Sequence, residues 1–279
     1  MLVDWHYREL VDKYMIKIPP TKGPVPEPFL PSTLRDWEAG EQTSDIDWRA
    51  TILARGPDWG KAVPLVREKL VEEAGLIAKK IPSLEIWVDT SGSMPDPRVQ
   101  LNAFTVAALV LAAACIRQGG RVRGVIWSAR NPIIMREWMR TEEAARRFFL
   151  QRIGGGTEFP IREFVELSRD RGPAWGAIRA IISDSDLNHN FSIYGGRAHD
   201  SETIDAFHDV AKRSERIVFV LNSRGGDIDA EAYQSLDQEK VKVVVVDQPV
   251  APNEKALMQK LTDVMSKAMQ QLGEALFEK

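Results

Sequence analysis

An apolar run that stops at a polar turn is the feature that most constrains how this chain can fold. Residues 84–88 are rich in aliphatic and aromatic side chains, which is typical of a buried strand, and the run ends at Asp89. Asp89, Ser91 and Ser93 then alternate along a turn in which Gly92 lets the backbone bend, so their oxygens can converge. Such hard oxygens are the ligands that Mg²⁺ and Mn²⁺ prefer. The stretch therefore predicts a strand-to-helix turn that can hold a divalent cation.

Strand-like and helix-like segments alternate from about residue 81 to the end of the sequence. The predicted strands are residues 84–88, 122–128, 133–138, 177–184, 217–222 and 241–247, and the predicted helices are residues 98–118, 141–150, 160–169, 203–213 and 254–277. This order predicts an α/β fold, namely a doubly wound, mostly parallel six-stranded sheet with helices on both faces. Ligands of such sheets bind beyond the carboxyl ends of strands, where the strand order reverses.

Two more segments complete a recognisable pattern of oxygen donors. Residues 154–159 are Gly-Gly-Gly-Thr-Glu-Phe, and the predicted strand at 177–184 ends in an aspartate. Together with Asp-x-Ser-x-Ser, these motifs resemble the metal-ion-dependent adhesion site of the von Willebrand factor A (VWA) family. The resemblance implies that the strands ending at residues 88 and 184 are neighbours and that a sixth metal position is left open for a partner's carboxylate. It also implies five metal ligands: Asp89, Ser91, Ser93, Thr157 and Asp184.

Nearby residues leave some alternatives open. Asp186 could replace Asp184 as a ligand, although the apolar run ends at Asp184. Glu158 could accept a hydrogen bond from a metal ligand without binding the metal itself. The loop over residues 187–200 is expected to form part of a partner-binding rim. Three histidines follow at spacings of 10 and 9 residues, which fit no compact zinc-binding pattern: His189, His199 and His208.

The first 80 residues differ in character from the rest. Residues 3–15 predict a short amphipathic helix, a proline-rich connector follows, and residues 64–78 predict a further helix. Between these helices, tryptophans recur at positions 37, 48 and 59, where they either anchor an irregular segment or form a docking surface for a partner. We therefore expect an irregular extension over residues 1–80 and a VWA-like domain with a C-terminal helix over residues 81–279.

Composition excludes several classes of protein. Among 279 residues, 37 lysines and arginines oppose 40 aspartates and glutamates, and a net charge of −3 argues against general binding to nucleic acid or anionic membranes. The single cysteine, Cys115, lies in an apolar helical run and is expected to be a small buried residue rather than a nucleophile. No apolar run approaches the ~20 residues of a membrane span, and charged residues stand where a signal peptide needs an apolar core. We expect a cytoplasmic protein.

The resemblance, which covers about residues 81–250, implies a function. Bacterial cytosolic proteins with these two motifs work with MoxR-type AAA+ ATPases, so it implies a non-enzymatic, Mg²⁺- or Mn²⁺-dependent adaptor that binds a partner protein. A metal-independent structural VWA domain remains an alternative. A haloacid dehalogenase-like phosphatase is less favoured, because Ser91 stands where those enzymes use a second aspartate as the acid/base.

Overall fold

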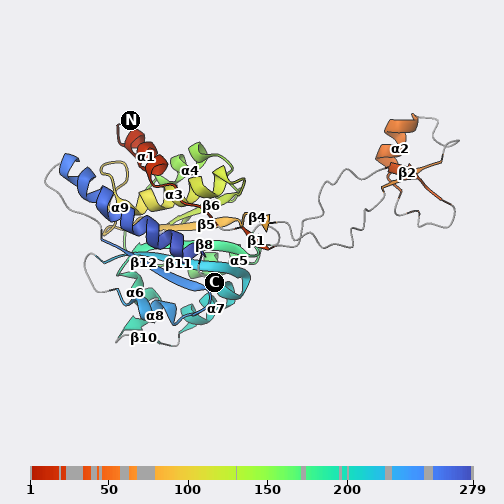
Figure 1. Cartoon of the computed structure of the whole chain (residues 1–279). Coiled ribbons are helices and arrows are strands. Elements are labelled where there is room, and N and C mark those ends of the chain that lie inside the picture. The colour runs from red at the N-terminus through yellow and green to blue at the C-terminus, as the bar shows by residue number, and fades with distance from the viewer. Residues whose placement is uncertain are drawn as a thin grey trace. The chain divides into compact units, whose positions relative to one another are not determined.

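The computed structural model describes thirteen ranges of the chain, and they fall into two compact units. The described residues are 2–18, 20–22, 34–38, 43, 46–56, 63–67, 79–129, 131–170, 174–194, 197–199, 201–223, 228–247 and 254–277. The larger unit comprises Met1–Thr21 and Ile81–Lys279, and the smaller unit comprises Lys22–Lys80 (Figure 1). The smaller unit is therefore an insertion in the chain of the larger one.

The larger unit is built on one sheet. Its strands are β5 (Leu84–Asp89), β6 (Val122–Trp127), β7 (Ile133–Ile134), β8 (Ala177–Asp184), β11 (Ser214–Asn222) and β12 (Val241–Val246). Their order in space is β12-β11-β8-β5-β6-β7, and only the β6–β7 pair is antiparallel. The predicted six-stranded, mostly parallel sheet is confirmed. The implied adjacency of the strands that end at Asp89 and Asp184 is observed as well, because β5 pairs with β8.

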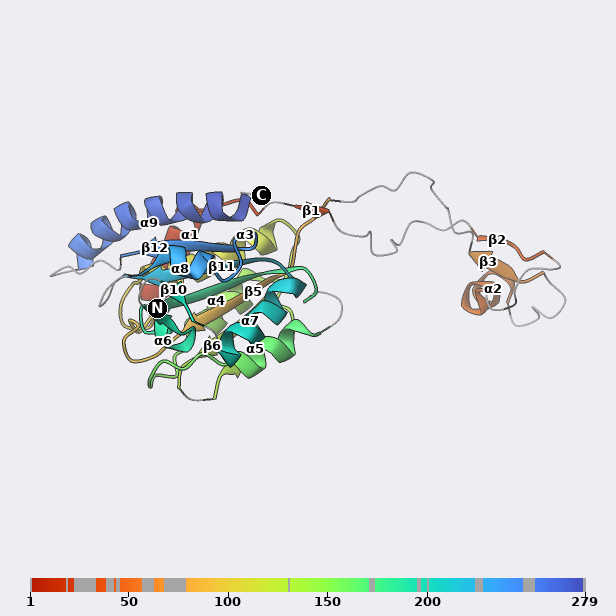
Figure 2. The ribbon, with the colours of Figure 1, turned by 90° about the horizontal axis from the view of Figure 1, so that it is seen from below.

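Helices cover both faces of this sheet (Figure 2). One face packs against α1 (Leu2–Lys13), α3 (Ala103–Arg117), α4 (Glu142–Phe149) and α9 (Glu254–Phe277). The other face packs against α5 (Ile161–Ser168), α6 (Leu187–Asn190), α7 (Glu202–Arg213) and α8 (Ala230–Gln234). Two short strands, β9 (Ile193–Tyr194) and β10 (Arg197–Ala198), pair antiparallel beside them. None of the helices in the described ranges is both long and apolar enough to cross a membrane.

The N-terminal helix belongs to the larger unit, which differs from the boundary expected at residue 80. The helix itself was predicted, but its apolar side chains are buried in the core that contains α3: Tyr7, Leu10, Val11 and Tyr14. The hydroxyl of Tyr7 donates to the carbonyl of Gln100 at 3.2 Å and accepts from the backbone N–H of Asn102, the residue that caps α3, at 3.2 Å. An amphipathic helix has to bury its apolar face, and here α3 supplies the surface.

The smaller unit contains one helix and a pair of strands. Strands β2 (Leu34–Asp36) and β3 (Leu65–Arg67) pair antiparallel, and α2 (Trp48–Arg55) lies between them in sequence. The hydroxyl of Thr51, the buried residue of α2, accepts a hydrogen bond from the backbone N–H of Leu65 at 2.9 Å. This bond ties the helix to β3. Strands β1 (Thr21–Lys22) and β4 (Lys79–Lys80) form a separate two-stranded sheet.

The helix predicted over residues 64–78 is wrong at its start. Residues 65–67 form strand β3 because pairing with β2 satisfies their backbone, which the local sequence pattern does not reveal. The rest of that predicted helix, residues 68–78, lies outside the described residues, as do Trp59 and most of the proline-rich connector. Of the other two tryptophans, Trp37 is half-buried and Trp48 is exposed.

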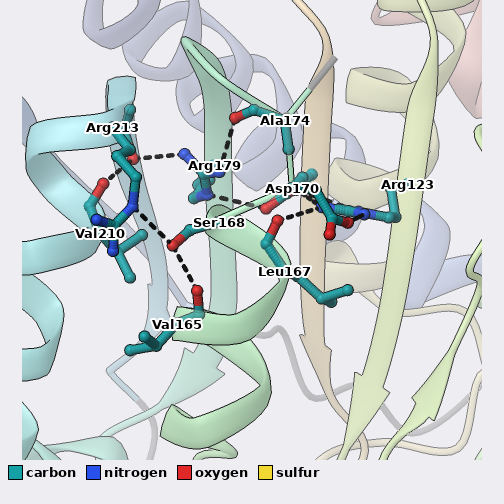
Figure 3. Close-up of polar contacts among 11 residues, drawn as sticks. Arg123, Val165, Leu167, Ser168, Asp170, Ala174, Arg179, Val210 and Arg213 are labelled. Carbon is teal, nitrogen blue, oxygen red and sulfur yellow. Dashed lines mark hydrogen bonds and ion pairs between the residues drawn. The ribbon is translucent and has the colours of Figure 1, made fainter. Parts of the chain in front are cut away.

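A buried ionic network crosses the amino ends of the central strands. Glu85 on β5 accepts hydrogen bonds from Arg179 Nε at 2.8 Å and Arg123 Nε at 3.1 Å, and all three side chains are at most 2% exposed. The remaining guanidinium donors bind the carbonyls of Leu167 and Ala174, the hydroxyl of Ser214 and the carboxylate of Asp170, and Figure 3 shows the two arginines with partners of this kind. Each buried arginine in this layer therefore faces a carboxylate, and Arg123 faces a second, partly exposed one at Asp170.

Removing Glu85 should strongly destabilise the fold. In Glu85→Gln, Arg179 stays buried without a carboxylate and Arg123 keeps only that of Asp170, and breaking such a buried pair costs about 3–5 kcal/mol. Urea unfolding at pH 7 measures this loss. Glu143→Gln is the matched control, because it removes an exposed carboxylate paired with Arg147 and should cost less than about 1 kcal/mol. A Glu85→Gln variant as stable as this control would contradict the network's role.

Cys115 should be unreactive in the native protein. It is fully buried in α3, as expected from the sequence, and burial raises the pKa of its thiol to about 12. Only the thiolate reacts, so a disulfide reagent at pH 8 should label the folded protein orders of magnitude more slowly than the urea-unfolded protein. The absorbance of the thiol released from the reagent measures the rate of labelling. Rapid labelling without urea would show that α3 opens readily.

Candidate metal centre

Two aspartates meet at the carboxyl edge of the sheet. Asp89 is the last residue of β5 and Asp184 is the last residue of β8, and these strands are parallel neighbours. The chain runs from β5 outward to β6 on one side, whereas β8 continues to β11 and β12 on the other, so the strand order reverses between them. Ligands of open α/β sheets bind at such a point. Both carboxylates are buried, at 1% and 3% exposure.

Short polar contacts join four of the five residues expected to bind metal. The backbone N–H of Ser91 donates to Asp89 Oδ1 at 2.8 Å, and the hydroxyls of Ser91 and Ser93 lie 3.1 Å apart. Ser93 in turn hydrogen bonds to Asp184 through its side chain. Ser183, which is not one of the five expected ligands, donates its hydroxyl to Asp89 Oδ2 at 2.7 Å. The tight turn thus directs two hydroxyls and two carboxylates toward one another.

The glycine-rich segment is hydrogen-bonded to this turn through its backbone. The N–H of Gly154 donates to the carbonyl of Thr90 at 3.1 Å, and the N–H of Gly92 donates to the carbonyl of Gly155 at 2.7 Å. Gly154 and Gly155 have φ values of 72° and 119°, which favour glycine, and a Cβ at Gly92 would lie 3.3 Å from the Gly155 oxygen. These positions therefore require glycine for the two loops to approach.

Thr157 follows directly from this segment. Its side chain is half-buried, and no hydrogen bond joins it to the other four expected ligands, all of which lie within the described ranges. Two residues later, Phe159 is buried against Trp87 and Trp127, and its backbone N–H donates to Asn190 Oδ1 of α6 at 2.8 Å. Thr157 is thus fixed between two anchored points, beside the turn rather than within its hydrogen-bonded group.

The alternatives from the sequence occupy different surroundings. The side chain of Asp186 is exposed, and only its backbone reaches the group, by donating to Asp184 Oδ1 at 3.1 Å. Glu158 is exposed as well. His189 is exposed and the other two histidines are half-buried, and across the described ranges no three His, Cys, Asp or Glu side chains are grouped as a metal site.

The electrostatics of the site are those of an uncompensated anion. Burial raises the pKa of Asp89 to about 7; hydrogen bonds from Ser183 and Ser91 oppose this shift, and the nearby charge of Asp184 adds to it. Burial also raises the pKa of Asp184. In the described part of the chain, neither carboxylate has a cationic partner. Two buried carboxylates beside hydroxyl groups form a donor set that fits a hard divalent cation.

The sequence did not single out two residues that support this site. Ser183 immediately precedes Asp184, and the alternation of side chains along β8 places Ser183 on the same face as Arg179 and Ile181, which was a usable signal. Arg152 gave no such signal, since its contacts are with a loop that is distant in sequence. Asn190 lies in the loop that the sequence analysis expected beside the site, but its bond to Phe159 depends on the fold.

Comparison with known proteins finds similarity only among solved structures. No protein-family model matches the chain, and no curated protein matches it in sequence. The VWA domain of SpRpn10 aligns over 65% of this chain and 94% of its own, with a TM-score of 0.38 and 12% identity. The human COPII-coat protein Sec24c aligns over 66% of this chain and 32% of its own, with a TM-score of 0.38 and 14% identity. The vWF domain of the type V pili tip protein Mfa5 from Porphyromonas gingivalis aligns over 72% and 98%, with a TM-score of 0.38 and 9% identity. Similarities at this level establish neither kinship nor function.

Neutralising Asp89 should stabilise the metal-free protein. The pKa of this carboxyl is raised from 3.8 to about 7 on folding, so the metal-free fold loses stability as the pH rises from about 4 to about 7. Asp89→Asn keeps one oxygen acceptor and removes the buried charge, and we expect it to gain about 1–4 kcal/mol at pH 8. Urea unfolding in EDTA between pH 5 and pH 8 measures the difference. An Asp89→Asn variant less stable than wild type throughout this range would contradict the assignment of an uncompensated charge.

Proposed function

We propose that this protein is a metal-dependent protein-interaction module and not an enzyme. In this proposal, a Mg²⁺ or Mn²⁺ ion is held by Asp89, Ser91, Ser93, Thr157 and Asp184, and one metal position stays open. A carboxylate of a partner protein occupies that position. The bound ion would supply a positive charge that attracts this carboxylate, and the residues of the chain would orient it.

The observation that carries the proposal is the pair of buried carboxylates, which have no cationic partner among the residues that the structure describes. Holding two such charges near each other destabilises the fold unless a cation neutralises them. A protein that retains this arrangement has a reason other than stability, and cation binding is the reason that fits the donors. Serine hydroxyls add oxygen ligands without adding charge, so a cation bound here would still attract an external anion.

Access to the site supports binding of a partner rather than of a fully enclosed ligand. Gly92 and Ser93 are exposed at the tip of the turn, whereas Asp89 and Asp184 are buried beneath it. Val99, on the segment that follows the turn, is 77% exposed. An approaching protein would therefore meet Ser93 and an apolar side chain first, and its carboxylate could reach the cation from the solvent side.

The identity of the partner is proposed from the motifs. Asp-Thr-Ser-Gly-Ser-Met at residues 89–94 and Gly-Gly-Gly-Thr-Glu-Phe at residues 154–159 resemble those of bacterial cytoplasmic VWA proteins that work with MoxR-type AAA+ ATPases. We propose such an ATPase, or the target that it acts on, as the partner in the cytoplasm of a bacterium.

Calorimetric titration with Mg²⁺ and Mn²⁺ tests the metal site. Wild-type protein should bind one ion per chain, and Asp89→Ala should lose this binding because it removes one of the two buried carboxylates. Asp186→Asn, which changes the exposed alternative ligand, should bind as wild type does. Binding that is lost in Asp186→Asn but kept in Asp184→Asn would reassign the ligand. Wild-type protein that binds neither ion would overturn the metal-dependent proposal.

Partner binding is tested with the same variants instead of a chelator. An AAA+ ATPase itself needs Mg²⁺, so EDTA would inactivate both proteins and could not separate their contributions. Wild type and Asp186→Asn should bind a purified MoxR-type ATPase from the same genome or the ATPase's isolated target, and Asp89→Ala should bind at least tenfold more weakly. Equal binding by Asp89→Ala would instead support a metal-independent structural domain.

A further inference from the structure

Arg152 lies between the two loops that carry the proposed metal ligands. It follows α4 by three residues and precedes the glycine-rich segment, and its side chain is 24% exposed. Its Nη2 atom lies 3.3 Å from the carbonyl oxygen of Ser91 and 3.3 Å from that of Met94. These two carbonyls bracket Ser93, so a single guanidinium spans the part of the turn that aims both serine hydroxyls.

The same guanidinium also contacts an acid on the far side of the turn. Nη1 of Arg152 lies 3.5 Å from Asp96 Oδ2, and Asp96 is already held by Arg98 at 3.0 and 2.8 Å. Asp96 therefore does not depend on Arg152 for its charge partner. The contacts with the carbonyls of Ser91 and Met94 are different. Among the described side chains of the glycine-rich loop and its flanks, only Arg152 makes them.

Stability alone does not account for this arginine. Its Nε atom is buried and has no hydrogen-bond partner within the described part of the chain, which carries a cost for a polar group removed from water. Its positive charge also lies beside a site proposed to bind a cation, where it opposes binding by electrostatic repulsion. Both costs would be avoided by an uncharged residue, so we look for the benefit in the geometry of the guanidinium, whose Nη2 contacts both carbonyls while its Nη1 faces Asp96.

We infer that Arg152 is a positioning residue that fixes the Ser91–Ser93 turn relative to Thr157. The inference rests on the proposed metal site. Backbone bonds at Thr90 and Gly92 already join the two loops, and Arg152 adds contacts at the carbonyls of Ser91 and Met94, on either side of Ser93 at the tip of the turn. Arg152 thus holds the tip from the segment that leads into Thr157. Without this contact, the hydroxyls of the turn and of Thr157 would sample a wider range of separations, and the cation would lose affinity.

Two roles are open to Arg152, and they predict opposite changes in Mn²⁺ affinity when the arginine is replaced. If Arg152 acts only as a nearby charge, Arg152→Gln removes a repulsion and Mn²⁺ binds more tightly. If it positions the turn, Arg152→Gln binds Mn²⁺ at least fivefold more weakly. Arg152→Lys keeps the charge but has one nitrogen on a shorter side chain, which cannot contact the two carbonyls and Asp96 together, so it should also weaken binding at least threefold. A residue with a purely structural role would lower the unfolding midpoint and leave the affinity of the folded protein unchanged.

The experiment is a titration of the full-length chain with Mn²⁺, in which electron paramagnetic resonance measures the concentration of the free ion. The temperature is chosen so that circular dichroism shows each variant to be fully folded. Arg147→Gln is the matched control: it removes the same charge from an exposed arginine five residues earlier, which pairs with Glu143. It should bind within twofold of wild type. If Arg152→Gln does not fold, Arg152→Lys carries the test.

The outcomes separate the inference from the proposed function. Wild-type binding that is abolished in Asp89→Ala and weakened in both Arg152 variants supports the inference. Wild-type binding with equal or higher affinity in Arg152→Gln, or with unchanged affinity in Arg152→Lys, overturns the positioning role while the metal site stands. No binding by wild type overturns the metal site, and the positioning role with it.

Discussion

The parallel pairing of β5 with β8 is the constraint on which the rest of the larger unit depends. Their register places Glu85 opposite Arg179 near one end and Val88 opposite Ile182 near the other. Side chains alternate along each strand, so Glu85, Trp87 and Asp89 point to the same face of the sheet. A slip of one residue would turn both acids toward the apolar face that packs against α3. One pairing therefore fixes the core and the candidate site together.

The two ends of these strands handle buried charge in opposite ways. At the amino ends, Glu85 is bound by two arginines whose remaining donors find carbonyl, hydroxyl and carboxylate acceptors. At the carboxyl ends, Asp89 and Asp184 are also buried, but among the described residues they receive hydrogen bonds only from neutral groups. Proteins usually satisfy buried charge, and they depart from that rule mainly at functional sites. The contrast within one layer of one sheet is what singles out the carboxyl edge.

Much of the larger unit could be predicted because its signals are local. The bounds of β8 and α9 match the sequence prediction, since long apolar runs with polar or glycine-rich flanks are reliable markers of strands and helices. The placement of α1 could not be predicted, because the bond between Tyr7 and Asn102 joins residues 95 positions apart. Strand β3 was missed for a similar reason, as its partner lies about 30 residues earlier. At the site, the motifs identified residue types, whereas the anchoring of Thr157 through Phe159 and Asn190 needed the fold.

The insertion of the smaller unit has a consequence for the continuity of the chain. Residues 22–80 separate α1 from β5, yet both elements belong to one hydrophobic core. A single cleavage within the insertion would leave α1 on a separate fragment that is held by packing, by the hydroxyl of Tyr7 and by the ion pair between Asp12 and Arg117. The fragments would stay together at first, because the broken peptide bond contributes nothing to the packing of the helix itself. Dissociation of the α1 fragment would then depend on the protein concentration. Tyr7 binds the start of α3, so cleavage of the insertion would affect a part of the core that is distant from it in sequence.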